Sequence, residues 1–323
     1  MYSLREIKDK GYLPPKQLRR LLFYGYLALG KVFFTNMGAV KKLSSLPASK
    51  QRYHRPPRRF EIPSYDSSMK YCTKNEKFLR PTMYCNSHAP EIIALAHELG
   101  AYQKSDYEFA ESAFEFAKRK LTLEMLPLDG VEQTLKRGTG TCLHELSVFV
   151  ALCRAAGIKA RYKLYSMTMI EAWSDTLADD PMVQKWSDAM GYFMIHGEAE
   201  AYIDGEWRVG DVGPTPERQA GSNIPITRFG EDSIGIWFSV IPGTIMEVES
   251  IPFGLNVMMK LVFNVAPATV DNVNANVLDQ IKRGKKILEE KGEKAYDEEI
   301  RKNFKPKFPE PVLKKRREIV FEK

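Results

Sequence analysis

The sequence RGTGTCLHELSVFVALCRAAGIKARY, residues 137–162, joins a glycine-rich turn to a long apolar segment, with a cysteine at the junction. Apolar residues recur at helical spacing after Cys142, and Gly157 followed by Ile158 is typical of a helix end. We therefore expect Cys142 in the first turn of a helix. The unpaired amides and positive dipole there lower the pKa of a thiol and can hold an oxyanion, which makes Cys142 a candidate nucleophile. Cys153 lies among aliphatic residues and is expected to be a core residue.

The composition indicates a folded chain with an uneven distribution of charge. Its 323 residues are 44% hydrophobic and 28% charged, as in soluble globular proteins. Residues 1–60 contain 14 basic and 2 acidic residues, residues 61–280 contain 19 and 30, and residues 281–323 contain 15 and 9. Basic ends of this kind are suited to bind the acidic centre of the chain, anionic lipid or nucleic acid.

The cysteines indicate a reducing compartment, which we take to be the cytoplasm. There are four of them, with neither the density nor the spacing of a disulfide framework. A zinc site built from Cys72, Cys85 and His88 would lack a second complete ligand pair. We therefore expect neither a metal nor another cofactor.

Residues 21–40 form the most apolar segment, and basic residues flank both of its ends. Lys31 lies at its midpoint, where a charge in a membrane-spanning helix costs about 3 kcal/mol. We therefore expect a helix lying on a surface: the core of the protein itself, a partner protein or a membrane interface. The apolar residues at helical spacing are Leu18, Leu22, Leu29, Phe33, Met37 and Val40.

Composition divides the chain into three parts. Residues 1–80 form a basic arm that contains the apolar helix and a linker rich in Pro and Arg, which favours an extended segment. Residues 81–245 form the core, with helices expected over residues 90–100 and 106–121. Residues 246–323 form an extension, in which we expect a solvated charged helix and a peripheral tail.

A thiol nucleophile needs a base, and His196 is the best placed of five histidines. His144 is two residues from Cys142 and so points to a different side of the helix. His196 belongs to two predicted strands that meet at Asp204-Gly205, a favoured hairpin turn. The remaining histidines, for which the sequence offers no catalytic companion, are His54, His88 and His97.

The hairpin turn predicts which residues lie opposite one another. Ile203 faces Glu206, and continuing this register puts His196, Glu198 and Asp211 on one face of the sheet. Asp211 becomes the diagonal neighbour of His196 and can orient its imidazole, a role that Glu198 could also fill. The opposite face is apolar and suited to burial; it contains Ile195, Gly197, Ala199, Ala201 and Ile203.

The motif series GTC…RAAGIKAR…H…DGEW…D, over about residues 138–216, resembles the transglutaminase-like superfamily of papain-like thiol enzymes. The resemblance implies an α+β core in which helices pack on an antiparallel sheet, here with basic N- and C-terminal extensions. It also implies a Cys-His-Asp triad, with Cys142 as nucleophile, His196 as base and acid, and Asp211 as orienter. Further candidates for oxyanion or substrate contacts are Thr141, Gly140, Glu198 and Trp207.

The resemblance further implies hydrolysis or acyl transfer at an amide, isopeptide or thioester carbonyl, through an acyl-enzyme. A protease or amidase falls within this class, and the substrate would be a protein, a peptide or an acyl thioester. An acidic rim formed by Glu198, Glu200 and Glu206 would suit a basic substrate, although these residues could instead be the solvated face of a hairpin.

The alternative is a non-catalytic accessory protein on the same fold, held to a partner protein or a membrane surface by residues 1–44. Either function fits a cytoplasmic protein at or near a membrane surface. We expect no specific nucleic-acid binding, because no recognised module surrounds the basic and aromatic residues 52–60.

Overall fold

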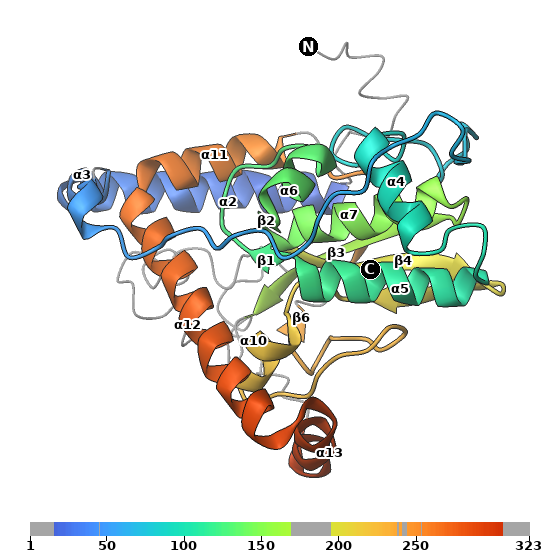
Figure 1. Ribbon diagram of the computed structural model, residues 1–323. Helices are drawn as coiled ribbons and strands as arrows, with labels where there is room; N and C mark the ends of the chain where they lie inside the picture. Colours follow the sequence, from blue (N-terminus) through green and yellow to red (C-terminus); the bar gives the residue numbers. More distant parts are fainter. Residues whose placement is uncertain are drawn as a thin grey trace.

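The computed structural model describes residues 16–44, 46–168, 195–237, 239–240, 244–252 and 254–305. It has the expected α+β architecture, with helices packed on an antiparallel sheet (Figure 1). The charged tail expected over residues 311–323 lies outside the described residues.

The central sheet has the strand order β5-β4-β3-β6, and β7 also pairs with β3. All of these pairs are antiparallel. A separate parallel pair joins two short strands, β1 and β2. The strands are β1 (Thr122–Leu123), β2 (Thr139–Gly140), β3 (Ala160–Thr168), β4 (Ile195–Ile203), β5 (Glu206–Gly210), β6 (Ser239–Val240) and β7 (Met246–Val248).

The register predicted for the β4–β5 hairpin is confirmed. Ile203 pairs with Glu206, and the ladder continues to the pair of Ala199 with Gly210. Asp204 and Gly205 both have positive φ, 53° and 85°, as a two-residue hairpin turn requires. Asp211 therefore follows directly after the end of β5.

The helix that begins at Cys142 is the centre of the fold. This helix, α7 (Cys142–Ala155), is buried at every residue from Leu143 onward, which explains why apolar residues are not confined to one of its faces. It packs on β3 and β4 and against three further helices (Figure 1). These helices are α4 (Pro90–Glu98), α5 (Asp106–Lys120) and α6 (Val131–Arg137).

The apolar N-terminal segment is helical, as predicted, and forms α2 (Lys16–Thr35) and α3 (Met37–Leu43). Leu18 and Leu22 are buried in the main core, whereas Met37 is 61% exposed and so does not face the protein. In the part of the chain that the structure describes, no helix is long and apolar enough to cross a membrane.

The linker that follows α3 is extended after the single turn η1 (Ala48–Lys50) and runs along the molecule towards α4 (Figure 1). Its arginines bind carboxylates of the central part of the chain. Arg55 makes two hydrogen bonds of 2.8 Å to Glu124, and Arg52 donates its backbone N–H to Asp271 at 2.9 Å. The basic linker thus binds acidic residues of the central part of the chain. This is one of the three kinds of binding partner that its charge predicted, beside anionic lipid and nucleic acid.

The C-terminal extension is not simply solvated, contrary to our expectation. It consists of α11 (Leu255–Val265), α12 (Pro267–Lys291) and α13 (Glu293–Asn303). Where α12 crosses α10 (Pro216–Gly221), the two backbones touch. A methyl group on Gly284 would lie 1.6 Å from the Glu217 carbonyl oxygen, and one on Gly221 would lie 2.2 Å from that of Gln280. Only glycine leaves room for this crossing.

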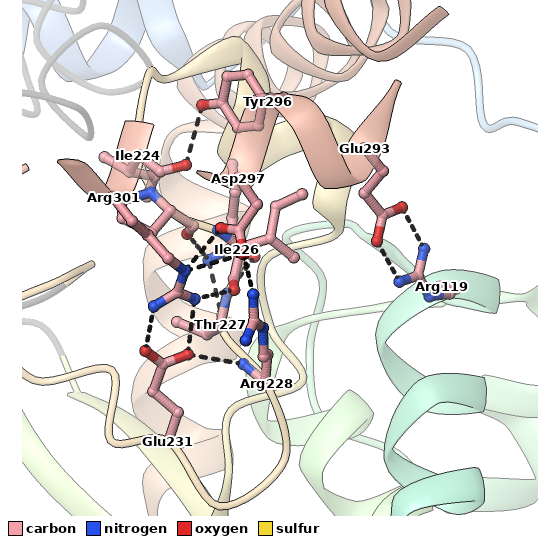
Figure 2. A network of polar contacts seen from close by, with 12 residues as sticks. Arg119, Ile224, Ile226, Thr227, Arg228, Glu231, Glu293, Tyr296, Asp297 and Arg301 are labelled. Carbon is pink, nitrogen blue, oxygen red and sulfur yellow. Dashed lines mark hydrogen bonds and ion pairs between the residues drawn. The ribbon is translucent and has the colours of Figure 1, made fainter. Parts of the chain in front are cut away.

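A polar network holds α13 against the segment that follows α10 (Figure 2). The Asp297 carboxylate accepts a hydrogen bond of 2.9 Å from the Ile226 N–H, and Arg301 binds both Asp297 and Glu231. At the other end of α13, Glu293 pairs with Arg119 of α5. The C-terminal helices are therefore joined to the core on two sides.

We expect Gly284→Ala to lower the free energy of unfolding by about 3 kcal/mol, because the added methyl group forces α12 away from α10. Thermal and urea unfolding measure this change. The matched control is Gly38→Ala, at an exposed helical position with no atom nearby, which should be neutral or stabilising by up to about 1 kcal/mol. Equal behaviour of the two variants would contradict the close crossing.

Candidate active site

Cys142, His196 and Asp211 come together from three different elements. Cys142 begins α7, His196 lies near the start of β4, and Asp211 follows β5. The His196 Nε2 is 3.7 Å from the Asp211 Oδ1. A methyl group on Gly213 would lie 3.4 Å from Asp211 Oδ1, 3.4 Å from His196 Cε1 and 3.5 Å from Cys142 Cβ. The three side chains therefore approach one point.

Cys142 is partly exposed, whereas the other three cysteines are buried. The surrounding protein nevertheless removes enough water from its thiol to raise the pKa to about 12, and the charge of Asp211 adds to this effect. The backbone N–H groups of Leu143 and Cys142 interact with the sulfur and act in the opposite direction. Our expectation of a lowered thiol pKa is therefore wrong. The amides are placed as predicted, but burial outweighs them.

The imidazole of His196 is held from two sides. It is 2% exposed, and the ring of Tyr165, its partner across the β3–β4 ladder, packs edge-on at 5.7 Å. Asp211 is fully buried, and its Oδ1 accepts a hydrogen bond of 3.1 Å from the Gly213 N–H. Burial opposes ionisation of Asp211, but His196, Lys118 and this amide together keep its pKa below the usual value. Asp211 is thus a carboxylate, as an orienting residue must be.

Lys118 of α5 is a buried basic residue that stabilises the turn after β5 by hydrogen bonds. Its Nζ donates hydrogen bonds to the carbonyl oxygen of Pro214 at 2.7 Å and to Thr227 Oγ1 at 3.0 Å. Burial lowers the pKa of Lys118 to about 8, although the charge of Asp211 favours its protonated form. We did not identify this residue from the sequence. Lys118 follows Phe114 by four residues and so lies on the same buried face of α5. This spacing could have predicted that Lys118 is buried.

Two further buried ionisable residues, Arg218 and Glu145, lie near the thiol, and we did not identify either from the sequence. Arg218 of α10 is 1% exposed, and burial lowers its pKa to about 10. Glu145 lies one turn after Cys142 on α7, and neither of its carboxylate oxygens has a hydrogen-bond partner among the described residues. Burial and the neighbouring Cys142 raise the pKa of Glu145 well above its usual value. Its spacing of three residues from Cys142 was a usable signal, whereas nothing in the sequence marks Arg218 as buried.

Thr141 and Gly140 directly precede Cys142, and His144 packs against both of them. The Thr141 N–H donates to His144 Nδ1 at 3.0 Å, so this amide is not available to an oxyanion. A methyl group on Gly140 would lie 2.5 Å from His144 Cβ, so the glycine makes room for the imidazole rather than for a substrate. His144 itself is buried and pairs with Asp129 at 3.2 Å. Its two ring nitrogens contact Thr141 and Asp129, so it fixes the start of α7.

Glu198 lies on the same strand as His196, but other partners hold it. Its carboxylate accepts hydrogen bonds from the N–H and the hydroxyl of Ser233 and pairs with Lys163 at 2.9 Å. Burial raises its pKa to about 7. Glu200 is also buried and pairs with Arg161, and only Glu206 is exposed. Glu198 and Glu200 therefore form neither an acidic rim nor a solvated face.

Trp207 lies outside the candidate site. It packs against Phe78 at 5.3 Å and against Tyr202, its partner in the β4–β5 ladder. Arg161 covers its ring at 4.0 Å. Tyr202 is six residues from His196 along β4, a separation of about 20 Å in an extended strand. Trp207 stabilises the far end of the hairpin, and its proposed substrate contact is not supported.

No metal site accompanies these residues in the part of the chain that the structure describes. No group of three or more His, Cys, Asp or Glu side chains is arranged there to hold a metal ion.

Comparisons with known proteins give one family match and one similar solved structure. Residues 93–212, a little over a third of the chain, match the model of the transglutaminase-like superfamily. A solved structure from Cytophaga hutchinsonii, described as a candidate cysteine protease, is 18% identical with a TM-score of 0.33. The match covers 53% of this chain and 45% of that one, so it spans less than half of the solved protein. A comparison with curated proteins gave no match.

We expect alkylation of Cys142 by iodoacetamide to accelerate about tenfold per pH unit between pH 7 and pH 9. The reason is that a thiol with a pKa of about 12 is almost entirely protonated over this range, and only the thiolate reacts. Peptide mapping by mass spectrometry measures the rate at each cysteine. The buried Cys85 and Cys153 serve as controls and should react more slowly. A rate at Cys142 that is already constant above pH 7 would show a preformed thiolate instead.

We expect Glu145→Gln to stabilise the protein increasingly as the pH rises from 5 to 8. The pKa of Glu145 is raised by folding, so this group favours the folded state only below its unfolded pKa of about 4.5 and loses that contribution at higher pH. Glutamine does not titrate. The difference in Tm between variant and native protein should therefore grow with pH. The exposed Glu61→Gln is the control and should show a constant difference, and the same flat profile for Glu145→Gln would contradict the raised pKa.

Proposed function

We propose that this chain, whose residues 93–212 match the model of the transglutaminase-like superfamily, is a thiol enzyme acting on carbonyl compounds. Its substrates are amides, isopeptides or thioesters of proteins, peptides or acyl carriers. The observation that carries this proposal is the approach of Cys142, His196 and Asp211 to one point beside Gly213. Nucleophile, base and orienter are the three groups that such chemistry requires.

In the proposed first half-reaction, the Cys142 thiol gives its proton to His196 while the sulfur attacks the carbonyl carbon. The amides of Leu143 and Cys142, which interact with the sulfur, would stabilise the oxyanion of the tetrahedral intermediate. The imidazolium of His196 then donates the proton to the leaving amine or thiol. This step leaves an acyl group on Cys142.

In the second half-reaction, His196 removes a proton from water, which attacks the acyl group and releases a carboxylic acid. The proton returns to the Cys142 sulfur, so the enzyme is restored. An amine in place of water would give a new amide, the transfer reaction. We favour hydrolysis because water is always present, whereas transfer needs a second site for the amine.

Asp211 supports both steps through His196. Its carboxylate pairs with the imidazole at 3.7 Å, and hydrogen bonds in this class commonly shorten when a substrate binds. In the proposed cycle the imidazole accepts a proton twice, and Asp211 holds the ring in position for both transfers. Since the resting thiol is protonated, the reaction depends on this base more strongly than in an enzyme with a preformed thiolate.

A small activated ester tests the proposal directly. We expect p-nitrophenyl acetate to place one acetyl group on Cys142 with a burst of p-nitrophenolate, detected by intact-mass and peptide-mass spectrometry. Cys142→Ala should abolish this adduct, and His196→Ala should slow acetylation at least about 100-fold, as expected for loss of a general base. Removing the orienter in Asp211→Asn should slow it as well.

Matched controls are Cys72→Ala and His97→Ala, which change the same residue types outside the site and should leave the rate unchanged. Acetylation of another residue, or equal rates in native protein and His196→Ala, would contradict the proposal. The accessory function, with the fold retained for docking, would then be favoured.

A further inference from the structure

The N-terminal helices and α11 each carry a second apolar face, which points away from the protein. On α2, Phe23, Leu27 and Phe34 are 60%, 56% and 74% exposed, and Met37 of α3 is 61% exposed. Their spacing puts the three residues of α2 along one stripe. On α11, Val257 and Leu261 are four residues apart and are 57% and 45% exposed. Large apolar side chains exposed in lines of this kind usually mark an interaction site.

A different face of α2 and of α11 packs in the hydrophobic core. Leu18 and Leu22 of α2 and Leu255 and Met258 of α11 are buried in the main hydrophobic cluster. Both helices thus contribute to one cluster, and Figure 1 draws them along each other in the upper part of the view. The exposed stripes are therefore additional to the faces of these helices that pack in the core.

The charge of this surface is entirely of one sign. The segments Lys16–Thr35 and Met37–Leu43 contain six basic and no acidic residues, and Leu255–Val265 contains one basic and no acidic residue. The basic side chains reach solvent beside the apolar ones: Lys260 is exposed between Val257 and Leu261, and Lys31 is exposed between Leu27 and Phe34. By contrast, α12 and α13 mix acidic and basic residues.

We propose that α2, α3 and α11 together bind an anionic lipid surface, with the helices lying in the plane of the interface. Exposed aromatic and aliphatic residues flanked by Lys and Arg on an amphipathic helix are the features that insert into the headgroup region and attract negative lipids. The stripe on α2 runs from Phe23 to Phe34, about 17 Å along the helix axis, and the exposed Met37 follows on α3.

Charge also argues against a second copy as the occupant. A symmetric dimer would bring the same surface together with itself, so the basic side chains of both copies would repel each other. An anionic membrane neutralises those charges and receives the apolar residues in one contact.

Vesicle flotation with the full-length chain tests the proposal. We expect binding to phosphatidylcholine vesicles that contain phosphatidylserine and at least tenfold weaker binding to phosphatidylcholine alone, with binding reduced by salt. Leu27→Ser/Phe34→Ser should weaken binding at least tenfold through the apolar contact, and Lys31→Glu/Lys260→Glu through the charge. These positions are exposed, so the variants should keep the native Tm.

The matched control is Ile245→Ser/Lys285→Glu, which changes an exposed apolar and an exposed basic residue outside the three helices and should bind as the native protein does. Cys142→Ala should also bind anionic vesicles as the native protein does. A failure of the lipid proposal can therefore be distinguished from a failure of the proposed enzymatic function. Equal loss in the control, or no binding to anionic vesicles, would overturn the proposal. Sedimentation that shows a dimer dissociated by Leu27→Ser/Phe34→Ser would instead assign the surface to self-association.

Discussion

The buried charge of Asp211 is the constraint around which the candidate site is organised. A carboxylate without solvent is costly unless several groups stabilise it. Here His196, the Gly213 amide and the Lys118 ammonium share that task. The contact with His196 therefore both stabilises the Asp211 carboxylate and positions the imidazole in the proposed triad.

This arrangement extends well beyond the region that matches the family. Lys118 binds Thr227, whose N–H donates to Gln219 of α10, and the adjacent Ile226 is held by Asp297 of α13. Helix α10 in turn rests on the backbone of α12. The C-terminal helices therefore support the turn that carries Asp211, although they lie outside residues 93–212. They are therefore part of the same packed structure as the candidate site.

Several elements were predictable because local rules decide them. The Asp204-Gly205 turn predicted the β4–β5 register, and apolar periodicity ending at Gly157 predicted α7. The pKa of Cys142 was not predictable in this way, since the amides at a helix start are local whereas desolvation depends on the whole fold. The assignment of Trp207 to the site was wrong because Trp207 and Asp211 belong to the same motif but lie at opposite ends of β5. The burial of Glu198 follows from Lys163 opposite it on β3, a pairing that requires the order of strands to be known.

A double-mutant cycle on the rate of Cys142 acetylation tests most directly whether the three residues act as one unit. If Asp211 acts only through the imidazole, adding Asp211→Asn to His196→Ala should slow the reaction no further. The account predicts this strong non-additivity. Independent, multiplying effects of the two substitutions would contradict it and would separate Asp211 from the chemistry at Cys142.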